Sequence, residues 1–398
     1  MTVETQAQGA VPARTVRLVI LVLALANFII GIGAFLVIGA MVPIIEDFGV
    51  SAARGGWIMT SYAISYAIMS PIIVALTGSA GRRKVLSLGL LLFTLSCVVA
   101  ALAPNDIVLN AARVLAAAGA GIVTPVAAAV AAGISRPEAQ GKALSAVFLG
   151  FTLAQVVGVP AGSFLAYSLG WRAAFWIVGG LAFPVMLGVW TLIPAGLSFR
   201  AVRLGDLGRV LANPRHMFAV LFTFSFVGAT YVVFTFLTPL LSETMGFGRN
   251  QMTVVLLVYG SGAVAGNLLG GGLTDRIGPF RTLLILAVSQ VIWNACLSQL
   301  PMPVWTVFVL VFLWSSFGWS FFVAQQTRLL RLAPERAPVM MAINAAALYA
   351  GVAAGSAVGG AVLSTWGLLA LGYGGALVAL WSAVHLVLSE RMARQDAA

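Results

Sequence analysis

Ten long stretches of the sequence contain no Asp, Glu, Lys or Arg, and the longest are residues 282–327 and 337–389. A membrane-spanning helix needs about 20 predominantly apolar residues, so each stretch has room for at least one span. The two longest have room for two spans each, divided at Pro301-Met302-Pro303 and at Trp366-Gly367. Charged residues make up only 8% of the chain, against about 25% in soluble domains. The pattern excludes a soluble globule and predicts an all-α membrane protein with twelve transmembrane helices.

A stripe of small residues occurs twice, at an offset of 197 residues. Residues four apart lie above one another on a helix, and a smooth stripe lets a second helix approach closely in lipid. The same offset pairs Tyr62 with Tyr259. We expect two homologous six-helix bundles related by a pseudo-twofold axis, residues 1–194 and 218–398, joined by a linker at 195–217. The stripes are Gly150, Ala154, Gly158 and Gly162, and Ala347, Gly351, Gly355 and Gly359.

Pro160 lies inside the first of these stripes. Proline removes a backbone hydrogen bond from a helix, so this position predicts a kink. We take Gly158, Pro160 and Gly162 as candidate gating residues of this span.

The net charge is +11, and the basic residues are distributed unequally between the two sides of the membrane. With an even number of spans both chain ends share a side, and all but four of the 22 lysines and arginines fall on it. The exceptions are Arg54, Arg172 and Arg249 on the other side and Arg113 within a span. The positive-inside rule then places both termini of this multi-pass protein in the cytoplasm. The partner expected for the basic excess is anionic membrane lipid, and no nucleic acid.

The linker at 195–217 carries basic residues at spacings of three and six, namely Arg200, Arg203 and Arg209. This spacing suits a short amphipathic helix that lies on the membrane. The composition equally suits a solvated linker. The sequence leaves both interpretations open.

The spans lack the groups that an intramembrane enzyme needs. From the sequence we expect no paired aspartates, no cluster of histidines and no Ser–His pair in the spans, and the chain has no phosphate-binding Gly-Lys-Ser/Thr loop. Cys97 and Cys296 fall in the third and ninth predicted spans, where we expect packing residues rather than a disulfide or a zinc site. We predict no catalytic residue, no metal and no cofactor.

Four segments carry a resemblance to a known family: GVPAGSFLAYSLGWRAAF at 158–175, GLTDRIGPFR at 272–281, ARVLAAAGAG at 112–121 and QTRLLRLAPERAPVMMAINAAALYAGVAAGSAVGG at 326–360. They are similar to motifs of the major facilitator superfamily, in its drug/proton antiporter group. Within that group the chain resembles the bacterial sugar-efflux and chloramphenicol-resistance permeases. The resemblance implies a monomeric secondary transporter of the bacterial cytoplasmic (inner) membrane. Such a transporter exports small organic solutes, such as drugs, sugars or metabolites, by alternating access.

The resemblance also implies roles for charged residues. Arg113 matches the embedded arginine of the fourth-span motif, and we expect it either to attract an anionic or carbonyl-rich solute or to bond span-one carbonyls and Asn27. The basic loops are expected to form a cytoplasmic gate latch, in which Asp275 caps a helix start and pairs with arginine. The latch residues are Arg82, Arg83, Asp275, Arg276 and Arg281.

The sequence leaves two alternatives for proton coupling. The permeases that this chain resembles carry a glutamate in the first span, where this chain has Ala34. All 11 acidic residues map to loops, tails or span ends, and a proton relay at the membrane midplane normally needs an ionisable group there. His385 falls in the last span, where we read a single histidine as a packing residue. The alternatives are efflux with the proton as second partner and a proton-independent facilitator or uniporter on the same fold.

Aromatic and amide residues of the spans are the candidates for the substrate site. Polar side chains inside a membrane usually face the protein interior or a cavity. Aromatic rings combined with amides suit a small-molecule substrate that is neutral, amphipathic or sugar-like. Together with Arg113 the candidates are Asn27, Tyr62, Gln155, Tyr231, Phe234, Tyr259, Trp314, Trp319, Gln325 and Asn344.

Overall fold

The computed structural model describes residues 12–77, 80–136, 139–195, 197, 211–333 and 337–394. These ranges fold into helices joined by short turns, and 12 of the helical segments are long and apolar enough to span a membrane. The charge-free stretches therefore predict the spans correctly. Residues 198–210, which contain the basic spacing of the predicted linker, lie outside the described residues.

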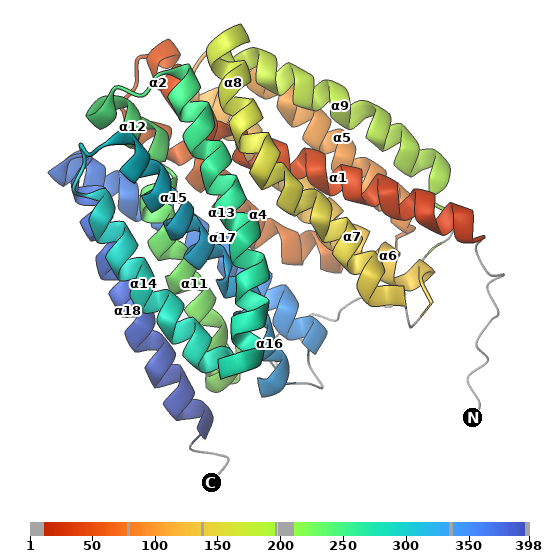
Figure 1. Ribbon diagram of the computed structural model, residues 1–398. Coiled ribbons are helices and arrows are strands. Elements are labelled where there is room, and N and C mark those ends of the chain that lie inside the picture. The colour runs from red at the N-terminus through yellow and green to blue at the C-terminus, as the bar shows by residue number, and fades with distance from the viewer. Residues whose placement is uncertain are drawn as a thin grey trace.

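The helices divide into two sets of spans (Figure 1). The first set comprises α1 (Ala13–Gly39), α2 (Met41–Phe48), α3 (Ala52–Gly55), α4 (Trp57–Leu76), α5 (Arg82–Ala101), α6 (Asp106–Ile134), α7 (Gln140–Leu153), the π-helical turn η2 (Ala154–Gly158), α8 (Val159–Leu169) and α9 (Trp171–Leu192). The second comprises α11 (Pro214–Phe234), α12 (Leu237–Met245), α13 (Arg249–Ile277), α14 (Pro279–Leu297), α15 (Val304–Trp319), α16 (Phe321–Leu332), α17 (Ala337–Trp366) and α18 (Ala370–Arg394).

The packing of the first set is repeated in the second. In the first set α1 packs on α7 and α8, α4 packs on α6, and α5 packs on α9. In the second set α11 packs on α17, α13 packs on α15, and α14 packs on α18. Each contact therefore recurs between the spans six places further along the chain. This repetition confirms the two pseudo-twofold-related six-helix bundles.

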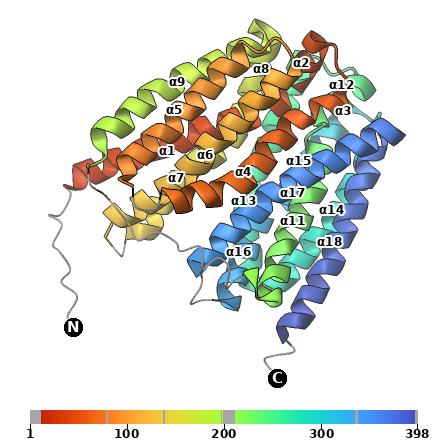
Figure 2. The ribbon, with the colours of Figure 1, turned by 180° about the vertical axis from the view of Figure 1, so that it is seen from behind.

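The two bundles meet at one end and diverge toward the other (Figures 1 and 2). They meet at what we call the short-helix end, where α2 packs on α12 and Thr238 Oγ1 donates a 2.8 Å hydrogen bond to the Ile38 carbonyl. They diverge toward what we call the basic end, where α1 begins, α18 ends, and Arg83, Arg276 and Arg281 lie. Along their length the bundles touch through α4 with α17, and through η2 and α8 with α13.

The predicted small-residue stripes are close helix contacts, as expected. A Cβ atom added at Gly158 would lie 2.6 Å from Ile32 Cγ1 of α1, and one at Gly162 would lie 2.9 Å from Leu36 Cβ. In the second bundle the Cβ positions of Gly355 and Gly359 meet the backbone of α11 in the same way. Both stripes thus hold the equivalent pair of helices together in their own bundle.

The helix irregularity predicted at Pro160 takes the form of the π-helical turn η2, which ends at Gly158. Pro160 lies in the first turn of α8, and without an N–H it cannot bond to the carbonyl of Val156 four residues earlier. Wider turns of this kind are often found at functional sites. The turn η2 also contacts α13 of the other bundle, so it lies directly at the interface between the bundles.

We expect the substitution Gly158→Leu to reduce transport by overpacking the contact between α1 and the fifth span. Extra side-chain volume in a packed interior typically costs about 1–3 kcal/mol. The matched control is Gly180→Leu, because Gly180 is exposed on α9 and its added Cβ would have no atom within 4 Å. Normal transport by Gly158→Leu at normal expression would mean that this contact does not limit the transporter.

Candidate functional site

Arg113 is buried in α6, with only 1% of its surface exposed. Its three guanidinium nitrogens bond three backbone carbonyls: Nη1 donates to Gly33 at 2.5 Å, Nη2 to Ala34 at 2.7 Å and Nε to Ile58 at 3.3 Å. Among the described residues no carboxylate pairs with it. The expected bond to span-one carbonyls is therefore confirmed, and the hydrogen bonds of this buried positive charge go to backbone carbonyls.

A group of three tyrosines, which we call the tyrosine junction, lies beside Arg113 and joins the two bundles. The guanidinium carbon of Arg113 lies 4.3 Å from the ring centre of Tyr62 in α4, a cation–π contact. Tyr66, one turn further along α4, stacks on Tyr349 of α17 with ring centres 3.7 Å apart. Tyr62 meets the same Tyr349 ring edge-on at 6.3 Å. The Tyr62 hydroxyl is buried without a hydrogen-bond partner in the described structure, so it is available to a bound solute.

A second aromatic group fills the middle of the second bundle. Phe234 of α11 stacks on Tyr259 of α13 at 4.2 Å, and Trp314 of α15 packs edge-on against Tyr259 at 5.5 Å. Tyr231 meets Phe234 edge-on at 5.5 Å. Trp319 Nε1 donates a 3.1 Å hydrogen bond to the Tyr259 hydroxyl. The structure therefore brings these predicted site residues into one cluster.

A polar network links α11 to α16 and α17. Gln325 Nε2 donates to the Ala219 carbonyl at 2.9 Å and to Thr223 Oγ1 at 3.0 Å, and Thr223 donates to Asn344 Oδ1 at 2.5 Å. Both predicted amides, Gln325 and Asn344, are therefore engaged within the protein. Thr223 joins them, although no sequence pattern indicates it as a site residue.

Two predicted site residues lie apart from these groups. Asn27 donates to the carbonyl of Leu23 within its own helix at 3.2 Å. It does not bond Arg113, so the expected contact between them is wrong. Gln155 lies in η2, which packs against α1, α7, α8 and α13. Conversely, the structure adds Tyr66 and Tyr349 to the site. The spacing of Tyr66, one helical turn after Tyr62, was the available signal for it.

The sequence family described as Major Facilitator Superfamily matches residues 23–356. The chain belongs to this superfamily. It is 34% identical over 369 residues to the "Chloramphenicol resistance protein" of Streptomyces lividans, covering 90% of this chain and 93% of the relative. It is 28% identical over 397 residues to the "Inner membrane transport protein YdhP" of Escherichia coli K12, covering 94% of this chain and 96% of the relative. The chain is thus a transporter and not an enzyme.

A solved structure has the same fold. It is a bacterial homologue of the human lysosomal transporter Spinster in an inward-facing, occupied conformation, with a TM-score of 0.71 and 19% identity over 98% of both chains. The resemblance of this major facilitator superfamily chain to that structure concerns the fold alone.

The latch residues of this major facilitator superfamily transporter lie at the basic end. Arg82 and Arg83 begin α5, and the guanidinium of Arg83 lies 4.4 Å from the ring centre of Trp190 in α9 of the same bundle. Asp275 does not cap a helix start: it lies in the last turn of α13, and Gly278 occupies the N-cap position of α14. The expected cap is wrong because α13 continues through the aspartate to Ile277. Arg276 and Arg281 flank this turn.

The short-helix end carries ion pairs that the sequence did not predict. Arg54 of α3 forms a two-pronged pair with Asp106 of α6, at 2.6 and 3.0 Å. Arg172 of α9 pairs with Asp47 of α2 at 2.5 Å. Arg249 bonds Ser168 of the other bundle at 3.3 Å. The three basic residues assigned to this side from the sequence are therefore all engaged.

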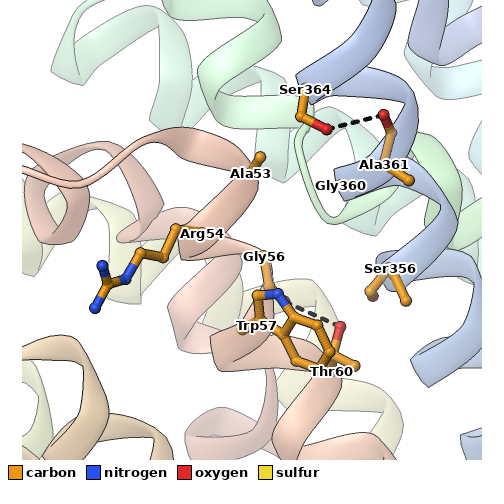
Figure 3. A pocket seen from close by; sticks show the side chains of 10 residues that line it. Ala53, Arg54, Gly56, Trp57, Thr60, Ser356, Gly360, Ala361 and Ser364 are labelled. Carbon is orange, nitrogen blue, oxygen red and sulfur yellow. Dashed lines mark hydrogen bonds between the residues drawn. The ribbon is translucent and has the colours of Figure 1, made fainter.

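A cavity of about 360 Å³ lies at the short-helix end, where α3 and α4 face α17. Figure 3 shows Arg54 pointing away from α17, while Thr60 and Ser356 face the space between the helices. The lining contains none of the predicted substrate residues. It consists of Ala53, Arg54, Gly56, Trp57, Thr60, Ser356, Ala357, Gly360, Ala361 and Ser364.

Proposed function

We propose that this transporter exports small organic solutes with a flat, weakly polar ring, and that the solute binds at the tyrosine junction beside Arg113. The stacking of Tyr66 on Tyr349 carries the proposal, because it is an aromatic contact between the two bundles themselves. A flat solute inserted between or beside these rings would touch both bundles at once. Arg113 and the free Tyr62 hydroxyl would hydrogen-bond its carbonyl, nitro or hydroxyl groups.

A binding site between the two bundles couples solute binding to alternating access. A ligand can shift an equilibrium between two conformations only through its different affinity for them. The affinity for a solute bound between α4 and α17 depends on the separation of the bundles, whereas the affinity for a solute bound within one bundle does not. The bundles diverge toward the basic end, which the positive-inside rule assigns to the cytoplasm of a bacterial inner membrane. A solute would accordingly enter from the cytoplasm.

Chloramphenicol is the first probe, since the Streptomyces lividans relative is named for resistance to it and it combines an aromatic ring with nitro, amide and hydroxyl groups. Purified transporter in proteoliposomes, loaded or bathed with labelled chloramphenicol, should transport it saturably. Failure to move this probe and a panel of ring-bearing neutral solutes would overturn the proposal.

We expect Tyr66→Ala to raise the KM for chloramphenicol about three- to tenfold, since an aromatic pair contributes about 0.5–1.5 kcal/mol beyond its buried area. Tyr66→Phe, which keeps the ring, should stay near the unmodified value. Tyr373→Ala is the control, because Tyr373 is 51% exposed on α18. An unchanged KM in Tyr66→Ala would place the solute elsewhere.

The second candidate function is a proton-independent facilitator, favoured by the position of the described acidic residues at helix ends, such as Asp106 in the first turn of α6. The two functions differ in the final distribution of the probe. A facilitator brings chloramphenicol to equal concentrations on both sides of the membrane. A coupled exporter accumulates it inside everted vesicles when a pH gradient is imposed.

A further inference from the structure

His385 is buried within the second bundle, and both of its ring nitrogens form hydrogen bonds. It lies on α18 and is 5% exposed. Its Nε2 is 2.9 Å from the carbonyl of Phe218, and its Nδ1 is 3.2 Å from Ser225 Oγ, both on α11. A carbonyl only accepts hydrogen bonds, so Nε2 carries a hydrogen. The protonation state then depends on Nδ1.

Ser225 can form a hydrogen bond with the His385 ring in either protonation state. Its hydroxyl lies 3.0 Å from the carbonyl of Phe222 as well as 3.2 Å from Nδ1 of His385. When the hydroxyl donates to Nδ1, the ring is neutral. When the hydroxyl donates to Phe222, Nδ1 is free to carry a second hydrogen and donate it to Ser225 Oγ. The same positions of the heavy atoms therefore accommodate both imidazole and imidazolium, and every N–H and O–H group has an acceptor in each state.

We propose that His385 is the intramembrane proton-binding site of this transporter and that its protonation acts on α11. The inference rests on the proposed function only for the solute to which the proton is coupled. A histidine exchanges its proton near neutral pH without any neighbouring carboxylate. It would therefore supply an ionisable group within the spans that the eleven acidic residues do not provide.

The groups around His385 define its electrostatics. The ring contacts the rings of Phe218, Phe222 and Trp381, with centres 4.4, 6.3 and 6.4 Å away. The titratable or charged residues of the helices packed on α18 are Arg215, His216 and Tyr231 of α11, Arg281 and Cys296 of α14, and Tyr349 of α17. On α18 itself they are Tyr373, Glu390, Arg391 and Arg394. The positive charge of Arg328 on α16 also acts on the ring.

Polar and charged residues lie between His385 and the basic end. Ser389 lies one turn further along α18 and accepts a 2.8 Å bond from Arg328 Nη2 of α16. Arg328 Nε is 3.6 Å from the carboxylate of Glu390, whose side chain is 22% exposed. Glu390 thus pairs with Arg328 at a partly exposed position near the basic end. It also offsets the Arg328 charge, which would otherwise oppose a second cation at His385.

The link from His385 to the solute runs through α11. On one face Phe218 and Ser225 bond His385, and on another Ala219 and Thr223 bond Gln325. The same helix ends with Tyr231 and Phe234 of the aromatic cluster. Protonation reverses the direction of the bond between His385 and Ser225 and lets the Ser225 hydroxyl donate to the carbonyl of Phe222. We expect this exchange to change how α11 is held between the two sites.

The first test measures protonation of His385 in the absence of any solute. The described chain and the sequence contain two histidines, His216 and His385. In detergent-solubilised protein labelled with ¹³C at the histidine ring, we expect a resonance that titrates between about pH 5 and 8 and vanishes in His385→Gln. Ser225→Ala should shift its midpoint. The absence of a titrating His385 resonance in the folded protein would overturn the proposal.

The second test measures coupling with chloramphenicol in proteoliposomes. A proton-coupled transporter gains up to about tenfold in accumulation per pH unit and proton exchanged. We expect His385→Gln to lose this stimulation while still equilibrating the probe, and the control His216→Gln to keep it. Gradient stimulation that survives in His385→Gln would overturn the assignment. If chloramphenicol is not moved at all, the proposed function fails, and the titration still decides the proton site.

Discussion

Arg113→Lys is expected to lower chloramphenicol transport by at least about tenfold while the protein remains folded. The guanidinium of Arg113 bonds carbonyls of α1 and α4 with three separate nitrogens. A lysine ammonium is one compact point charge and cannot reproduce this fork. Each bond to a charged group contributes about 1.5–3 kcal/mol, and about 1.4 kcal/mol corresponds to a factor of ten.

The control for this substitution is Arg172→Lys. The guanidinium of Arg172 also lies over an aromatic ring, that of Trp171, but at the short-helix end and away from the tyrosine junction. This variant should transport normally. Thermal unfolding of both variants separates a loss of structure from a loss of function. Unimpaired transport by Arg113→Lys would mean that the site needs a positive charge and not the directed bonds.

Gly355→Leu is expected to prevent assembly of the second bundle. The Cβ of any side chain at this position would lie 3.0 Å from the Cα and carbonyl carbon of Gly228 in α11. Backbone cannot rotate aside as a side chain does, so α11 and α17 would have to separate. Their separation would also break the hydrogen bonds of Thr223 with Asn344 and of Thr235 with Ser356.

The yield of monodisperse protein in mild detergent measures this effect. Gly271→Leu is the matched control, because an added Cβ at Gly271 has no atom within 4 Å. It should be obtained in normal yield. A Gly355→Leu protein with normal yield and thermal stability would show that the crossing of α11 and α17 is looser than its backbone contacts imply.

Patterns that depend on local spacing predicted the fold well. Charge-free stretches gave the spans, and four-residue spacing gave the stripes that hold α1 to the fifth span and α11 to α17. These signals succeed because helix periodicity and the length of a span are properties of the local chain. The prediction that Asp275 caps a helix start is wrong although it also rests on local sequence, since nothing in the neighbouring residues indicates that α13 continues to Ile277.

The site was predicted less completely because its contacts join distant residues. The equivalence of Tyr62 and Tyr259 in the repeat does not extend to their surroundings: Tyr62 packs against Arg113, and Tyr259 packs against Trp314 and Trp319. The sequence predicts a packing role for His385, and its hydrogen-bond partners lie 160 and 167 residues away along the chain. Periodicity carries no information about such pairs.

The ion pairs at the short-helix end have a consequence for how the bundles part there. Arg54 with Asp106, and Arg172 with Asp47, each join two helices of the first bundle. The described polar bonds that cross to the second bundle end on neutral acceptors, the Ile38 carbonyl and Ser168. Dissolved salt screens pairs of opposite charges at the surface and acts far less on neutral contacts. Changes in the salt concentration on this side of the membrane should therefore have little effect on how readily the bundles part at this end, because no charge pair described there has to be broken.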